Sequence, residues 1–186
     1  MLQSISFVEV IFCWVVWALG FINPRKLAEG QAKVISAPAS KWGIILQALG
    51  SACTWAYVRP TAFVKPEPLL ILAMIVAPAS AVLGWAAARH LGKQWRFEAA
   101  LSENHELVQS GPYSWVRHPI YASMLGLLLA TGLVWTWWPM QVAGLLFFLI
   151  GTEVRVRAED RLLSERFGSS FAAYRSRVPA YIPFLR

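Results

Sequence analysis

The sequence predicts an all-α integral membrane protein with about five transmembrane helices and a C-terminal cytoplasmic helical segment. Hydrophobic residues occupy 57% of the 186 positions and charged residues only 15%, whereas soluble domains average about 25% charged residues. The ten tryptophans fit a chain that crosses membrane interfaces, where an indole buries its ring and keeps its N–H hydrated. The apolar residues are moreover gathered into stretches that approach the roughly 20 residues needed to cross a bilayer.

Five such stretches are separated by polar or turn-forming segments. They are approximately Ile5–Ile22, Trp42–Val58, Leu69–Ala88, Ile120–Trp137 and Met140–Val154. Because only Trp138 and Pro139 separate the last two, these should form a tight antiparallel helical hairpin. The first stretch does not fit a signal peptide, because it lacks a basic leading region and contains Glu9.

The distribution of basic residues predicts the orientation. With the N-terminus outside and five spans, 15 of the 17 basic residues fall on the inner side, and only Arg59 and Lys65 fall outside. Such a bias is typical of membrane proteins whose basic loops face the cytoplasm. The net charge of +7 is therefore explained by topology and anionic lipid headgroups, and nucleic acid is not expected as a partner.

Two polar segments lie on this predicted cytoplasmic side. Residues 89–118 are long for a simple connection. Residues 157–186 begin as an amphipathic helix that Gly168 is expected to end. The Val-Pro and Ile-Pro steps at 178–179 and 182–183 exclude a helix for the end of the chain. We therefore divide the chain into N-terminal transmembrane helices at 1–90 and a second half at 91–186, whose two polar segments could hold chemistry.

The segment HELVQSGPYSWVRHPIY at positions 105–121 carries the first candidate site residues. Pro119 suits the first turn of a helix and places His118 at its cap, where free N–H groups favour an anion. Equally, Arg117 and His118 could simply extend to lipid headgroups. Gly111-Pro112-Tyr113 is a turn signal, and the two tyrosines of the segment, at 113 and 121, fit either an interface or a ligand site.

Arg155 and Glu159 are four residues apart and so share one helix face, as do Glu153 and Arg157. Two interpretations stay open. The pairs could be surface salt bridges worth at most about half a kcal/mol, or a site, because ionisable groups near membrane depth usually face a cavity or a partner.

The cysteines show no metal-binding or redox pattern. Cys13 and Cys53 both lie inside apolar stretches, where cysteine behaves as a small hydrophobic residue. The sequence thus predicts no metal site.

Taken together, these features resemble the isoprenylcysteine carboxyl methyltransferase family, membrane-embedded enzymes that use S-adenosylmethionine. The first family pattern, H-x-L-V-x-x-G-x-Y-x-x-x-R-H-P-x-Y, is matched by His105, Leu107, Val108, Gly111, Tyr113, Arg117, His118, Pro119 and Tyr121. The later pattern is matched by Arg155, Glu159 with Asp160, Phe167-Gly168, Phe171, Tyr174, Val178-Pro179 and Pro183. The resemblance covers roughly residues 90–186, whereas the first three spans match only in being apolar.

The resemblance implies roles for these residues. The adenosine side of S-adenosylmethionine would be lined by His105, Glu106, Leu107, Val108 and Tyr113, and its amino-acid end would be held by His118, Pro119, Ile120 and Tyr121. Glu159 would contact the cofactor near the reacting centre, and Arg155 would orient the acceptor's carboxylate. Family members have two glutamates where this chain has Glu159-Asp160, which leaves the role of Asp160 open, and Glu98 is a further candidate cofactor contact.

The implied acceptor is lipophilic, typically the carboxylate of a prenylcysteine. A carboxylate is ionised at pH 7, so that its methylation needs alignment and electrostatics rather than a general base. Related membrane enzymes methylate phospholipid amines or thiols, for which Glu159 would have a different task. Two further alternatives are a sterol-reductase-like enzyme that binds NADPH through Arg157 and Arg161, and a non-catalytic membrane protein that binds lipids or partners.

Overall fold

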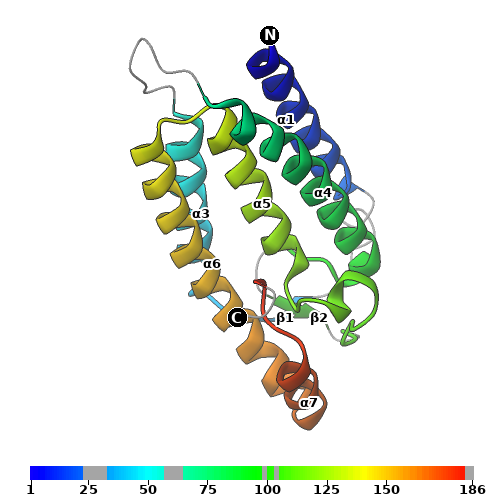
Figure 1. The fold of residues 1–186 in the computed structure, drawn as a ribbon. Coiled ribbons are helices and arrows are strands. Elements are labelled where there is room, and N and C mark those ends of the chain that lie inside the picture. The colour runs from blue at the N-terminus through cyan, green and yellow to red at the C-terminus, as the bar shows by residue number, and fades with distance from the viewer. Residues whose placement is uncertain (23–32, 57–64, 98–99, 103–104, 183–186) are drawn as a thin grey trace.

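A computed structural model of the chain describes residues 1–22, 33–56, 65–97, 100–102 and 105–182 (Figure 1). The longer helices are α1 (Leu2–Leu19), α3 (Ser40–Trp55), α4 (Glu67–Leu91), α5 (Pro119–Val134), α6 (Trp138–Phe167) and α7 (Ser169–Arg177). Two short 3-10 turns, η1 (Gly92–Gln94) and η2 (Gly111–Ser114), and two short strands, β1 (Lys33–Ser36) and β2 (Ala100–Ser102), complete the described elements. The first five long helices coincide with the five predicted apolar stretches, which confirms the all-α character of the fold.

Three of these helices, α1, α4 and α6, are long and apolar enough to cross a membrane within the described part of the chain. Helix α5 is apolar but has 16 residues, as has α3. Large apolar side chains are exposed on α1, α3, α4 and α6, among them Val8, Phe12, Trp42, Ile75, Val82, Leu146 and Ile150. A surface of this kind suits lipid rather than water, and it supports a multi-pass membrane protein. That all five helices span the bilayer stays a prediction.

Helix α6 joins two elements that the sequence analysis treated separately, the fifth span and the following amphipathic helix. It runs without interruption for 30 residues, or about 45 Å at 1.5 Å per residue, which exceeds the ~30 Å hydrocarbon core. Gly168 then ends it with φ +51°, a conformation that glycine adopts without strain. The prediction for Gly168 is thus confirmed, and α7 ends at Arg177, before Val178-Pro179, as expected.

Helices α5 and α6 are antiparallel and joined by a connection at 135–137 (Figure 1). The prediction of a tight hairpin is wrong, however, because the two helices do not pack chiefly against each other. Helix α6 packs chiefly against α3, and α5 packs chiefly against α4. The reason is a close approach of backbones: a Cβ atom at Gly43 of α3 would lie 2.7 Å from the carbonyl oxygen of Gly151 of α6. Small residues often make such helix contacts in membranes.

Two further contacts connect the segments at the lower end of the bundle in Figure 1. Strands β1 and β2 pair antiparallel, with Ser36 opposite Ala100; the sequence analysis did not predict these short strands. The C-terminal segment runs beside the start of α5, where the backbone N–H groups of Arg117 and His118 donate to the carbonyl oxygens of Pro179 and Ala180 at 2.8 and 2.7 Å. The start of α5 and the C-terminal segment are thereby held together.

Candidate functional site

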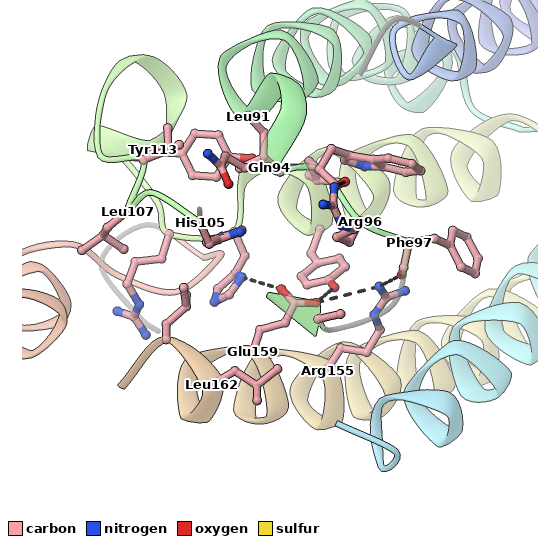
Figure 2. Close-up of a pocket in the computed structure, with 18 of the residues that line it drawn as sticks. Leu91, Gln94, Arg96, Phe97, His105, Leu107, Tyr113, Arg155, Glu159 and Leu162 are labelled. Atoms are coloured by element: carbon pink, nitrogen blue, oxygen red, sulfur yellow. Dashed lines mark hydrogen bonds and ion pairs between the residues drawn. The ribbon is translucent and has the colours of Figure 1, made fainter. Parts of the chain in front are cut away.

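A cavity of about 520 Å³ lies at this end of the bundle (Figure 2). Its walls come from α1, the end of α4, residues 94–97, 100 and 105–108, η2, the start of α5, α6 and α7. The predicted site residues that line it are His105, Glu106, Leu107, Val108, Tyr113, His118, Ile120, Tyr121, Arg155 and Glu159. The cavity lining does not include Pro119, which is the first residue of α5. The fold therefore gathers the candidates from three separate segments around one space.

Other lining residues carry no signal that sequence reasoning could have used. They include Trp17, Ala18 and Phe21 from the N-terminal region, and Leu91, Gln94, Trp95, Arg96, Phe97, Ala100 and Met124. Apolar residues of a membrane helix look alike whether they face lipid or a cavity, so only the packing of α1 distinguishes them. Glu98, a candidate cofactor contact, lies outside the described residues.

Glu159 is the acidic centre of the cavity wall formed by α6. The hydroxyl of Tyr121 donates a hydrogen bond to Oε1 of Glu159. On the other side, Nδ1 of His118 lies 3.3 Å from Oε2, and the Nη2 atom of Arg155 lies 3.8 Å from Oε1. With its side chain 25% exposed, Glu159 is held by three groups and still faces the cavity.

Arg155 is fixed beside Glu159 by contacts with other parts of the chain. Its Nη2 atom donates to the carbonyl oxygen of Phe97 at 2.6 Å, and Nη1 donates to Oε1 of Gln47 at 3.3 Å. The guanidinium also lies 5.0 Å from the centre of the Tyr121 ring, within the range of a cation–π interaction. The buried Nε atom has no hydrogen-bond partner among the described residues, which leaves one donor of a rigidly held fork available.

Asp160 faces away from the cavity, although it adjoins Glu159 in the sequence. It accepts hydrogen bonds from Nη2 of Arg117 at 2.8 Å and from Nε2 of His118 at 3.0 Å. Successive residues of a helix point about 100° apart, so Glu159 lines the cavity and Asp160 contacts Arg117 and His118 behind it. The sequence analysis left the role of Asp160 open. Its buried ion pair with Arg117 indicates a structural role.

His118 bridges the two carboxylates through its two ring nitrogens. Complete burial of the imidazole by itself lowers its pKa. The hydrogen bonds to Asp160 and Glu159 and their negative charges outweigh that effect, so the pKa lies above its ordinary value. The protonated ring is therefore favoured in the fold, where it joins Glu159 at the cavity to Asp160 behind it.

This arrangement predicts a loss of stability at alkaline pH. A histidine whose pKa is raised from 6.5 in the fold contributes fully below pH 6.5, and the contribution is lost as pH rises through the folded-state pKa. We expect the melting temperature in detergent to fall as pH rises above 6.5. A matched His118→Gln variant should melt lower at pH 6.5 and show a weaker decline. Equal declines in both proteins would contradict the prediction.

The opposite wall of the cavity carries aromatic rings, and the charged residues Arg96 and Glu106 also line the cavity. Burial, followed by the charges of Arg96 and Arg166, lowers the pKa of His105 to about 4, so this ring is neutral at pH 7. Its Nδ1 atom is buried without a hydrogen-bond partner among the described residues. Tyr113 is buried, and its carbonyl oxygen accepts a hydrogen bond of 2.5 Å from the hydroxyl of Tyr174. This wall therefore suits a planar, neutral group.

Two other predicted charge positions form surface ion pairs. Nε of Arg157 lies 2.8 Å from Glu153, and Nε of Arg161 lies 2.9 Å from Glu165. Both arginine side chains are strongly exposed, at 74% and 82%, and neither lines the cavity. Extra basic groups for the phosphate of NADPH are thus not supplied by Arg157 and Arg161 in this arrangement.

Comparisons with known proteins identify the family of the chain. A family model described as the isoprenylcysteine carboxyl methyltransferase (ICMT) family matches residues 70–165. The cobalt-zinc-cadmium resistance protein CzcN of Cupriavidus metallidurans is 40% identical over 84 residues, which are 45% of this chain and 38% of CzcN. YpbQ of Bacillus subtilis is 31% identical over 94 residues, 50% of this chain and 55% of YpbQ.

A protein-S-isoprenylcysteine O-methyltransferase of Xenopus laevis is 30% identical over 96 residues, 46% of this chain and 30% of that enzyme. The chain thus matches only about a third to a half of the length of these relatives. The matched residues of the family model include the start of α5 and the Arg155–Glu159 pair.

Proposed function

Because this chain belongs to the isoprenylcysteine carboxyl methyltransferase family, whose model covers more than half of it, we propose that it is a membrane methyltransferase. The methyl donor would be S-adenosylmethionine, and the acceptor a lipophilic molecule or lipidated protein with a carboxylate, as in a prenylcysteine. The single observation that carries this proposal is the Glu159–Arg155 pair at the wall of a cavity that is lined mainly by aromatic and apolar residues.

The residues around the cavity fit S-adenosylmethionine. The neutral His105, with its unpartnered Nδ1 atom, and the buried Tyr113 would line the adenosine side together with Glu106, Leu107 and Val108. The start of α5, with His118, Ile120 and Tyr121, would hold the amino-acid end. Pro119 would contribute indirectly, because α5 begins at this residue. These assignments would put polar, aromatic and charged groups beside the corresponding parts of the cofactor.

S-adenosylmethionine supplies a methyl group on a positively charged sulfur, ready for in-line displacement. Glu159 would place a negative charge beside that sulfur, and the bonds from Tyr121 and the contact with His118 keep its carboxylate in position before the reaction. Preorganised charges of this kind stabilise the transition state without rearrangement. A carboxylate acceptor needs no general base, because it is ionised at pH 7.

The acceptor would meet Arg155 and an apolar wall. The fixed guanidinium has an unpartnered Nε donor among the described residues, and charge-assisted hydrogen bonds from arginine define the geometry of a carboxylate. Trp17, Phe21 and Met124 line the same cavity and provide apolar surface for a lipophilic chain that enters from the bilayer. Membrane lipids would therefore surround both protein and acceptor.

We propose further that the N-terminus lies outside and that the cavity and the C-terminus face the cytoplasm. The support is the bias of basic residues in the sequence, together with the position of α7 at the end of the bundle opposite the N-terminus in Figure 1. A water-soluble, charged cofactor would then reach the cavity directly from the cytoplasm, and the acceptor would reach it from the membrane.

Calorimetric titration of the detergent-purified protein with S-adenosylhomocysteine tests the proposal. We expect saturable binding that Tyr113→Ala weakens about tenfold to a hundredfold, because an aromatic–base stack contributes about 1–3 kcal/mol. Tyr113→Phe is the matched control, since it keeps the ring and should keep the affinity.

Two results would contradict the proposal. Binding of NADPH in place of S-adenosylhomocysteine would indicate a reductase, and binding of neither compound by a folded sample would indicate a non-catalytic membrane protein. Unchanged affinity in Tyr113→Ala would show that Tyr113 does not bind the cofactor. The proposed activity would still be judged by whether the unaltered protein binds S-adenosylhomocysteine.

A further inference from the structure

Gln94 occupies a wall position that no motif points to. It is the last residue of η1, the turn that follows α4 after Gly92 adopts φ +49°. The N–H of Trp95 donates to the carbonyl oxygen of Gly92 at 3.2 Å and closes the turn. In Figure 2, Gln94 lies on the same side of the cavity as Tyr113 and opposite Glu159 on α6.

The amide of Gln94 is buried among the described residues without a hydrogen bond to any of them. The residue is only 4% exposed, and neither Nε2 nor Oε1 has a hydrogen-bond partner within the part of the chain that the structure describes. Buried polar groups are nearly always hydrogen-bonded, because an unpaired one is costly. A side chain that only filled this space could be apolar. The unpaired amide therefore indicates a ligand that has a hydrogen-bond donor and an acceptor side by side.

The surroundings of Gln94 narrow the chemistry of that ligand. Tyr113 offers an aromatic surface on the same side of the cavity, and His105 lines the cavity with a neutral ring whose Nδ1 is also unpartnered. The charged pair of Arg155 and Glu159 is on α6, across the cavity (Figure 2). Arg96, which also lines the cavity beside Gln94, donates to the carbonyl oxygen of Trp95. The amide and the rings on the Gln94 side therefore suit a planar, nitrogen-rich ring, and not an ammonium group.

We propose that Gln94 is a specificity-determining residue that binds the adenine edge of S-adenosylmethionine, an inference that rests on the proposed function. Oε1 accepts a hydrogen bond from the exocyclic N6 amino group, and Nε2 donates to the adjacent ring nitrogen. A carboxamide pairs with adenine in this two-bond manner in other settings. The role of Gln94 is to select adenine over purines that lack the amino group.

The test compares two ligands and two proteins by calorimetry in detergent. The ligands are S-adenosylhomocysteine and its 6-deamino analogue, which lacks N6 and is otherwise identical. The unaltered protein should prefer the first about tenfold or more. In Gln94→Met, which has a similar shape and no amide, affinity for S-adenosylhomocysteine should fall about tenfold, and the preference should disappear.

Stability of the ligand-free protein gives an independent measurement. Gln94→Met removes an unpartnered buried amide, so its melting temperature without ligand should equal or exceed that of the unaltered protein. A residue with a purely structural role would lower the melting temperature instead. Gln94→Glu supplies a second variant: it keeps the acceptor for N6 and loses the donor, so affinity should fall while the preference for the amino group persists.

The outcomes separate this inference from the proposed function. If the unaltered protein binds S-adenosylhomocysteine but Gln94→Met retains both the affinity and the preference for the amino group, the role of Gln94 is overturned and the methyltransferase proposal stands. An equal loss of affinity for both ligands, with the preference kept, also overturns adenine recognition by Gln94. If the unaltered, folded protein binds neither ligand, the proposed function fails first and the inference fails with it.

Discussion

Replacing Glu159 by glutamine is expected to reduce methyl transfer by about a hundredfold to a thousandfold, in line with the loss of one preorganised electrostatic group. The variant keeps the size of the side chain but removes the negative charge proposed to lie beside the sulfonium. It also converts one oxygen into an NH₂ donor, which would face the donors now contributed by Tyr121 and His118. The measurement is transfer of a radiolabelled methyl group to a prenylated N-acetylcysteine in detergent or lipid vesicles.

Asp160→Asn is the matched control, because it neutralises the neighbouring carboxylate on the same helix. Asp160 is buried against Arg117 and His118 and does not line the cavity. Removing one partner of a buried ion pair costs about 3 kcal/mol or more of stability, so this variant should melt at a lower temperature. At temperatures where it stays folded, its turnover should remain within a few-fold of the unaltered protein.

The pair of variants therefore separates chemistry from folding. Glu159→Gln should lose activity and keep most of its stability, and Asp160→Asn should do the reverse. Near-normal transfer by Glu159→Gln would refute the role given to that residue, even in an enzyme of this family. Loss of activity in Asp160→Asn without a change in melting temperature would show that both carboxylates take part in the reaction.

The sequence was sufficient to predict the helices, because their signals are local. Apolar stretches of the right length, proline at the start of α5 and glycine at the end of α6 each act within a turn or two of the chain. The same holds for Arg155 and Glu159, whose spacing of four residues puts them on one face of a helix. Their ion pair of 3.8 Å follows directly from that spacing.

What the sequence could not predict depends on contacts between distant segments. Helix α6 packs against α3 rather than α5 because their backbones approach closely at Gly43 and Gly151. A glycine in an apolar stretch does not indicate which other helix it will contact. The contribution of α1 to the cavity and the pairing of β1 with β2 likewise require the assembled fold. Gln94 is the strongest case. Only its burial without a hydrogen-bond partner in the described part of the chain distinguishes it from an ordinary polar residue in a turn.

Replacing Arg155 by lysine is expected to lower kcat/KM for a carboxylate acceptor by about a hundredfold, with little change in binding of S-adenosylhomocysteine. Lysine keeps the positive charge but lacks the planar fork that holds a carboxylate in fixed geometry. It also cannot reproduce the simultaneous bonds to Phe97 and Gln47, which now hold the guanidinium in place. Arg155→Ala should abolish turnover. That variant would also remove the donor to the carbonyl oxygen of Phe97 and to Oε1 of Gln47, so the lysine variant is the more specific test of carboxylate binding.

Arg157→Lys is the matched control, because Arg157 lies two residues further along α6, is 74% exposed and pairs only with Glu153 among the described contacts. Its acceptor kinetics should be unchanged. The comparison also distinguishes classes of acceptor: an amine or a thiol has no carboxylate for the fork of Arg155, so its methylation should tolerate lysine at 155. If Arg155→Lys methylates a prenylated N-acetylcysteine at the normal rate, Arg155 does not orient the acceptor's carboxylate. The apolar wall with Trp17 and Phe21 would then have to position the acceptor by its lipid chain alone.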